Sequence, residues 1–223
     1  CGHDCHTAML LGAARILKEN EDKIEGTVKL IFQPAEEGGA GGKMMREQGV
    51  LERPKVRQIF ALHVAGTMPM GTLASKEGTL LAATSSIKIL VKGNGGHAAA
   101  PHHTIDPVVT GSKIVVELQT LISRELSPLE SGVISITMAN AGSATNVIPS
   151  TMELQGTIRS LTSEGISKLQ NRVKEIAESI AIANRCEAEV SFPGNDYPPT
   201  VNDAGCWELG KAAAKDILSQ EKV

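Results

Sequence analysis

The stretch MELQGTIRSLTSEGISKLQNRVKEIAESIAIAN, residues 152–184, contains the cleanest strand pattern and the clearest helix pattern of the chain. Apolar side chains alternate over residues 152–158, which is typical of a strand with one buried face. From residue 163 onward the apolar positions follow the i, i+3, i+4 and i+7 spacing of a helix, namely Ile166, Leu169, Val173, Ile176, Ala177 and Ile180. We therefore predict a strand followed by a long amphipathic helix.

The segments around this stretch complete a recognisable order of elements. We expect a half-buried strand at 86–92, a helix at 106–123, a strand at 133–139 and a last strand at 188–192. The resulting order, β-α-β-β-α-β, is that of the split βαβ or ferredoxin-like arrangement. It predicts a separate domain over residues 82–192.

The first part of the chain has a different pattern. We expect a helix at 7–18, a short helix at 41–48 and two buried strands at 27–33 and 58–64. This alternation favours a mainly parallel sheet covered by helices, so the predicted fold class is α/β. The catalytic domain would then comprise residues 1–81 and, after the inserted domain, residues 193–223.

Composition excludes several classes of partner. The net charge is −3 and the pI is about 6.1, so the chain offers no basic face for nucleic acid and no cationic stripe for a membrane surface. Four cysteines in 223 residues lack the density of a secreted disulfide scaffold and indicate reduced thiols. Neither nucleic acid nor a membrane is therefore expected as a partner.

Glu36 and Glu37 follow the predicted strand at 27–33 directly. In open α/β sheets, sites form in the crevice beyond the carboxyl ends of the strands. Two neighbouring carboxylates in an extended turn point in different directions, so one can bind a metal while the other serves as a base. A solvated acidic turn is the alternative interpretation.

Further metal-binding residue types occur near the start of the chain and at the second predicted strand. Cys1 and His3 precede the first helix, and His63 lies near the end of the strand at 58–64. Thiolate, imidazole and carboxylate together suit a catalytic metal site, with either one or two ions. Cys1, His3, Cys5 and His6 are too closely spaced for a zinc finger. A Cys5–His6 nucleophilic dyad stays possible, but it would leave Glu36, Glu37 and His63 unexplained.

The inserted domain contributes three candidates. His97 follows three glycines within four positions, which would let the backbone approach a ligand closely. Asn146 and Arg159 bracket the third strand of this domain, and a guanidinium group suits the recognition of a substrate carboxylate.

Six motifs in order give the chain a specific resemblance. They are CGHDCHTA (from Cys1), QPAEEGG (from Gln33), ALHV (from Ala61), GGHAAAPH (from Gly95), NVIP (from Asn146) and GTIR (from Gly156). The chain resembles metal-dependent amidohydrolases of the aminoacylase, hippurate hydrolase and auxin-amino-acid conjugate hydrolase branch of the co-catalytic metallopeptidases.

This resemblance implies roles for the candidates. Cys1, His3, Glu37 and His63 would bind two divalent ions, manganese or zinc, and Glu36 would be the general base. His97 would stabilise the oxyanion, often in the partner subunit of a homodimer, from a lid and dimerisation domain. Asn146 and Arg159 would hold the carboxylate of an N-acyl amino acid. Asp4 and His6 would support the ligands or cap the helix, and Cys5 would be a packing residue.

The resemblance also implies what surrounds this stretch. Members of the family have further N-terminal strands and a further histidine ligand near the C-terminus, so we expect a fragment that lacks both ends. The alternatives to an amidohydrolase are a carboxypeptidase or dipeptidase of the same family and a non-catalytic dimerising member. The compartment would be the cytoplasm or, as for some plant members, the endoplasmic-reticulum lumen.

Overall fold

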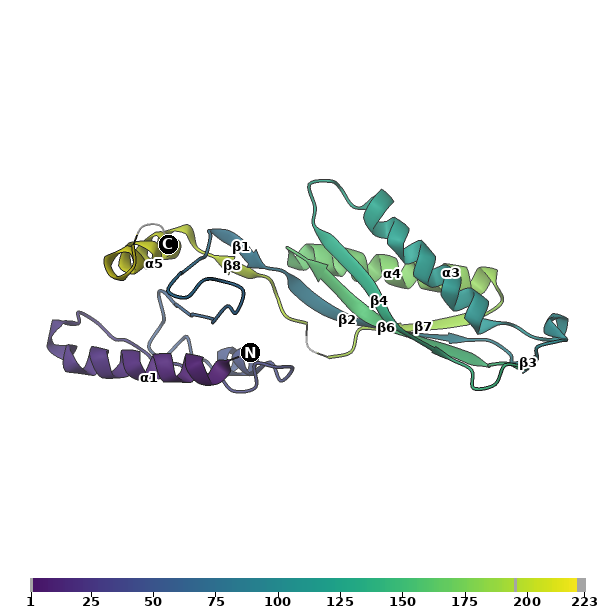
Figure 1. Ribbon diagram of the computed structural model, residues 1–223, viewed down its shortest axis with the longest axis horizontal. Coiled ribbons are helices and arrows are strands. Elements are labelled where there is room, and N and C mark those ends of the chain that lie inside the picture. The colour runs from purple at the N-terminus through teal and green to yellow at the C-terminus, as the bar shows by residue number, and fades with distance from the viewer. Residues whose placement is uncertain (1, 195, 220–223) are drawn as a thin grey trace. The chain divides into compact units, whose positions relative to one another are not determined.

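The computed structural model describes residues 2–194 and 196–219 (Figure 1). It divides into two compact units. The first unit consists of Cys1–Glu77 and Asn202–Val223, and the second unit of Gly78–Val201. The described residues contain no helix with both the length and the apolar content needed to cross a membrane.

The second unit contains a four-stranded antiparallel sheet in the order β4-β6-β2-β7. Its strands are β2 (Ala83–Lys92), β4 (Gly132–Ala141), β6 (Thr151–Ser160) and β7 (Glu187–Ser191). Its two long helices are α3 (Pro107–Thr120), after β2, and α4 (Ser163–Ala183), after β6. This is the connectivity expected of a split βαβ arrangement.

Side-chain alternation explains how this sheet is covered. The odd-numbered residues of β2 and the even-numbered residues of β6 are buried, for example Ile89 and Leu154, which are paired across the two strands. They pack with the apolar stripes of α3 and α4, which lie against one face of the sheet (Figure 1). The alternation predicted for the two strands is confirmed.

The helices of this unit begin where their capping residues indicate. The Asp106 carboxylate accepts hydrogen bonds from the amides of Val108 and Val109 at the start of α3, and Thr162 accepts one from Gly165 at the start of α4. After α3 the chain continues as a π-helical turn, Leu121–Glu125, so the segment predicted as a helix at 106–123 is helical from Pro107 onward but changes type after Thr120. Val116 of α3, although apolar, is 68% exposed.

Short elements complete the second unit. Strand β1 (Gly78–Leu81) pairs with β8 (Thr200–Asn202), and β3 (Gly96–His97) pairs with β5 (Val147–Ile148). A short 3-10 turn covers Pro101–His103. Between β7 and β8, Tyr197 exchanges two backbone hydrogen bonds with Thr84.

The first unit is built from helices and irregular segments. Its helices are α1 (His3–Glu19), α2 (Gly41–Glu47) and α5 (Ala204–Ile217), and a 3-10 turn spans Glu21–Lys23. α2 is followed by Gly49 with φ 82°, a left-handed conformation that commonly ends helices.

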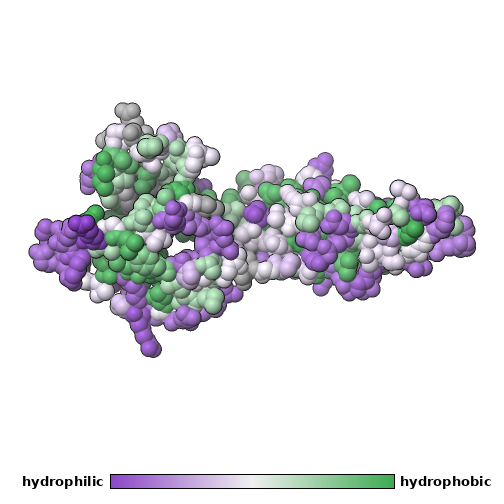
Figure 2. Space-filling model, turned by 60° about the horizontal axis from the view of Figure 1, so that its bottom comes forward, coloured by the Kyte–Doolittle hydropathy of each residue, from purple (hydrophilic) through white to green (hydrophobic). Residues whose placement is uncertain are grey.

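The predicted parallel sheet is wrong for the described part of the first unit. Residues 27–33 and 58–64 form no strand, and apolar side chains on them are exposed: Val28, Leu30, Phe32, Ile59, Phe60 and Leu62. Figure 2 shows hydrophobic residues gathered on the surface of this unit. A strand requires hydrogen bonds to a neighbour, and an apolar pattern in the sequence does not reveal whether that neighbour is present.

Candidate metal centre

Three segments of the first unit bring the predicted site residues together. The first turn of α1 carries His3 and His6, the turn after residue 33 carries Glu36 and Glu37, and the segment at 58–64 carries His63. Ligand atoms of His3, Glu36 and Glu37 lie within 4.8 Å of one another, and so do those of His3, His6 and His63. His3 belongs to both groups. Cys1, the remaining predicted ligand, lies outside the described residues.

The start of α1 does not use the caps expected from the sequence. The helix begins at His3 after Gly2, which has φ 78°, and no side chain caps it. Asp4 and His6 therefore lie within the helix, and the prediction that they cap it is wrong. Cys5 is exposed, so it is not a packing residue in the described structure.

The turn that carries the two glutamates is tight. Ala35 has φ 50°, an uncommon conformation for a non-glycine residue, and the amide of Gly38 donates to the carbonyl of Glu36 at 3.1 Å. A Cβ atom at Gly41 would lie 1.8 Å from the carbonyl oxygen of Pro34, so only glycine fits there. This folding back turns both carboxylates toward His3.

His3 lies between the two carboxylates. Its Nε2 is 3.6 Å from Oε2 of Glu36, and its Nδ1 is 3.7 Å from Oε1 of Glu37. Both distances exceed those of hydrogen bonds. Nε2 is buried and has no hydrogen-bond partner in the described part of the chain. A buried nitrogen facing a carboxylate across such a gap suits a shared cation, so the donor set fits a divalent metal ion.

His63 has one ring nitrogen engaged. Its Nδ1 lies 2.7 Å from the carbonyl oxygen of Val64, which can only accept a hydrogen bond. Nδ1 therefore donates, and Nε2 of the neutral ring carries a lone pair. Metal-binding histidines in proteins are usually held in this way, with one nitrogen donating to a carbonyl and the other available to the ion.

His6 has the opposite arrangement. The amide of Val64 donates to Nε2 of His6 at 3.0 Å. Desolvation, followed by the imidazoles of His63 and His3, lowers the pKa of His6 and favours its neutral form. The single lone pair of the neutral ring is thus already used.

The predicted residues of the second unit form their own group. His97 in β3 pairs with Val147 in β5, and the amide of Ala98 donates to the carbonyl of Asn146 at 3.0 Å. Nδ1 of His97 accepts a hydrogen bond from the amide of Ala99 at 3.1 Å, so the proton of the neutral ring resides on Nε2. His97 consequently presents an N–H donor.

The glycines before His97 serve the loop itself. A Cβ atom at Gly93 would lie 2.2 Å from the carbonyl oxygen of Ile105, and one at Gly95 would lie 2.5 Å from that of Ile148. Close approach of this loop to a ligand stays a prediction. The two glycines let the loop pack on its own backbone.

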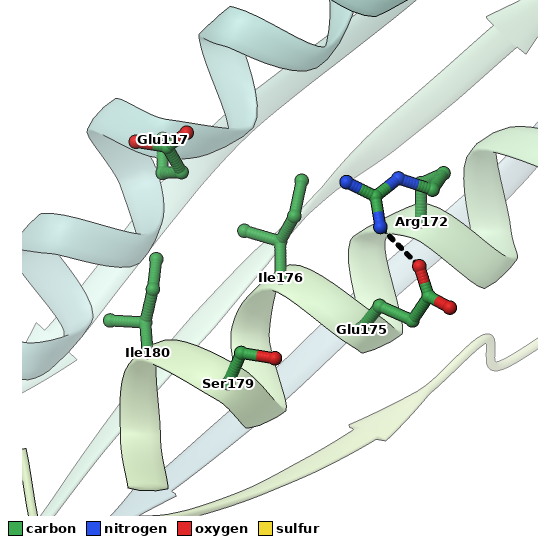
Figure 3. Close-up of a pocket in the computed structure, with 6 residues that line it drawn as sticks. All are labelled: Glu117, Arg172, Glu175, Ile176, Ser179 and Ile180. Atoms are coloured by element: carbon green, nitrogen blue, oxygen red, sulfur yellow. Dashed lines mark hydrogen bonds and ion pairs between the residues drawn. The ribbon is translucent and has the colours of Figure 1, made fainter. Parts of the chain in front are cut away.

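Arg159 lies in β6 among the residues opposite the helix-covered face. It is half-buried, is paired with Thr84 and Val133, and donates from Nη1 to the carbonyl of Ile158 at 2.9 Å. It forms no ion pair within the described part of the chain. Arg172 of α4, by contrast, forms ion pairs with Glu125 and Glu175. It lines a pocket between α3 and α4 (Figure 3). None of the predicted site residues lines this pocket.

The sequence of the whole chain, residues 1–223, matches the model of peptidase family M20/M25/M40. The chain belongs to this family. The resemblance noted from its motifs is thereby confirmed.

Its relatives include enzymes with several substrates. It is 47% identical to an IAA-amino acid hydrolase ILR1-like 2 of Arabidopsis thaliana, over 99% of this chain and 50% of that protein. It is 40% identical to the N-acetyl-L-cysteine deacetylase of Bacillus subtilis, over 96% and 51%. It is 42% identical to thermostable carboxypeptidase 1 of Saccharolobus solfataricus, over 91% and 52%. The chain thus spans about half the length of these relatives.

Among solved structures, the chain is similar to the YXEP protein of Bacillus subtilis, described as a dinuclear metal binding peptidase from the M20 family. The TM-score is 0.78 and the identity 34%, over 97% of this chain and 54% of that one. The mixed α/β fold expected from the sequence is confirmed.

Proposed function

We propose that the protein hydrolyses the amide bond of N-acyl amino acids or amino-acid conjugates and releases a carboxylic acid and a free amino acid. The observation that supports this most directly is His3, whose buried Nε2 lacks a hydrogen-bond partner in the described structure and faces Glu36. The relatives that hydrolyse IAA-amino acids and deacetylate N-acetyl-L-cysteine support the substrate class.

The metal centre would hold two divalent ions, manganese or zinc. Cys1, His3, Glu37 and His63 would bind them, and the dinuclear site named for the YXEP protein supports this number. When bound, such ions act as Lewis acids that polarise a carbonyl and make water more acidic. The soft Cys1 thiolate favours zinc, whereas harder carboxylate oxygens also suit manganese.

The residues of the chain would carry the proton transfers. Glu36 would take a proton from the attacking water and deliver it to the amine as the amide C–N bond breaks. His97, with its Nε2–H, would donate a hydrogen bond to the carbonyl oxygen as negative charge develops there. Asn146 and Arg159 would hold the carboxylate of the substrate.

We further propose that the second unit is a lid and dimerisation domain and that the protein is a homodimer. The two edge strands of its sheet differ in charge: β7 carries Glu187 and Glu189, whereas β4 contains no charged residue. Charged residues on an edge oppose pairing with another chain. The uncharged β4 edge is therefore the edge suited to antiparallel pairing with a second copy.

A carboxypeptidase or dipeptidase activity is the second candidate, favoured by the Saccharolobus relative. Turnover of an N-acetyl amino acid, an aryl-acyl conjugate and a dipeptide by the intact protein would separate the two. A preference for the dipeptide would exclude the first candidate. Absence of any bound divalent metal from active protein would exclude both.

A further inference from the structure

We propose that His6 is a positioning residue of the metal centre: through the backbone of Val64 it fixes the orientation and tautomer in which His63 presents Nε2. This inference rests on the proposed function, because it takes His63 to be a metal ligand. His6 would belong to the metal centre without binding metal or substrate.

Two hydrogen bonds hold the backbone of Val64, one on either side of its α-carbon. His6 accepts from the amide N–H of Val64 at 3.0 Å, and His63 donates to the carbonyl oxygen of Val64 at 2.7 Å. The N–H and the C=O belong to the two peptide groups that flank the Val64 α-carbon, so together these bonds restrain its φ and ψ. The direction of the carbonyl that orients His63 therefore depends on the anchor at His6.

The start of α1 also approaches Val64 closely at Gly2. A Cβ atom at Gly2 would lie 2.9 Å from Cγ2 of Val64, closer than side chains normally pack. Glycine at this position lets the first turn of α1 reach the Val64 backbone. The imidazoles of His6 and His63 then meet edge to face, with ring centroids 4.4 Å apart and planes inclined by 68°.

His6 is poorly suited to be a ligand itself. A neutral imidazole has one unprotonated nitrogen, and in His6 that nitrogen accepts the Val64 amide. Binding a metal through it would break this hydrogen bond and release the carbonyl that holds His63. Within the described residues, Nε2 of His63 therefore keeps its lone pair available to an ion, whereas the lone pair of His6 is occupied by the Val64 amide.

His6 should raise the metal affinity of the site because it restricts the motion of the ligand His63. Residues that orient metal-binding histidines typically contribute about 10–100-fold to affinity. His6→Phe keeps a ring but removes the acceptor, so we expect it to weaken zinc binding by about this factor. His6→Gln places an amide oxygen near the position of Nε2 and should restore most of the affinity.

The experiment measures zinc and manganese affinity of the intact protein by competition with a chelator, for wild type, His6→Phe, His6→Gln and the exposed control His102→Phe. The proposal expects a loss in His6→Phe, recovery in His6→Gln and no change in the control. An equal loss in both His6 variants would make His6 a ligand and overturn the proposal. Unchanged affinity in His6→Phe would overturn it as well.

A second measurement needs no variant and remains decisive if His6→Phe does not fold. Nitrogen NMR of the zinc-loaded wild-type protein should show the proton on Nδ1 in both His6 and His63. A proton on Nε2 of either ring would contradict the proposal. If wild-type protein binds no divalent metal at all, the proposed function fails; if it binds metal but His6 has no influence, only this inference fails.

Discussion

His97 and Asn146 lie beside each other in the second unit because the amide that follows His97 donates to the carbonyl of Asn146 at 3.0 Å. The two residues are far apart in sequence, and the short β3–β5 pair joins them. A candidate oxyanion donor and a candidate carboxylate-binding residue thus share one small piece of backbone structure.

Gly95→Ala should disturb this pair. The added Cβ would lie 2.5 Å from the carbonyl oxygen of Ile148, a backbone atom that cannot move independently. We expect a loss of about 1–3 kcal/mol in unfolding free energy, the usual range for overpacking, together with a lower kcat. Thermal melting and initial rates measure the two effects. Gly210→Ala in α5 is the control, because its Cβ would meet no atom within 4 Å; a similar loss there would refute the explanation.

Glu36→Gln and Glu37→Gln should separate the two carboxylates, which lie at nearly equal distances from His3. If Glu36 is the base, its glutamine variant should lose about 10²–10⁴-fold in kcat and keep its metal. If Glu37 is a ligand, its variant should lose metal first. Metal content and kcat are measured for both, with Glu47→Gln of α2 as a surface control. Loss of metal in Glu36→Gln with retention in Glu37→Gln would reverse the assignment.

Arg159 should recognise the carboxylate of the substrate. Hydrogen bonds to charged groups contribute about 1.5–3 kcal/mol, so we expect Arg159→Gln to lower kcat/KM by about one to two orders of magnitude. The same variant should act almost equally on an N-acyl amino acid and on its carboxamide, whereas wild type should prefer the acid. A variant that retains the wild-type preference would show that another group reads the carboxylate.

The stability of the second unit should depend on pH through Glu125. Hydrogen bonding to Arg172, with both nitrogen–oxygen distances 2.7 Å, lowers the pKa of Glu125 from its ordinary value of 4.5. Because the pKa is lower in the folded state, this contribution is complete well above pH 4.5 and is lost as the pH falls through the folded value.

Melting temperatures of wild type and Glu125→Gln between pH 7 and pH 3 check the direction of this effect. The difference between them should be largest at neutral pH and shrink in acid. Glu178→Gln is the matched control, because its ion pair with Lys174 is longer, 3.9 Å. A difference for Glu125→Gln that grows toward acid would contradict the prediction.

The long strands and helices of the second unit were predictable because their patterns are local and strong. The alternation in β6 and the helical spacing in α4 correspond to observed burial, with Leu154 and Leu169 fully buried. The residue-level motifs also sufficed to identify the family. By contrast, residues 27–33 and 58–64 have strand-like composition but form no strand, since composition does not supply a hydrogen-bonding neighbour.

The sequence by itself determined which chemical groups are available: the adjacent Glu36 and Glu37, the histidines near the start of α1, and His63. Only the tertiary structure decided how they are held. The donation from His63 to Val64 and the acceptor role of His6 depend on backbone atoms of Val64, and the place of His3 between two carboxylates depends on bringing distant segments together. Side-chain patterns do not encode such contacts, because a backbone amide or carbonyl is the same at every position until folding orients it.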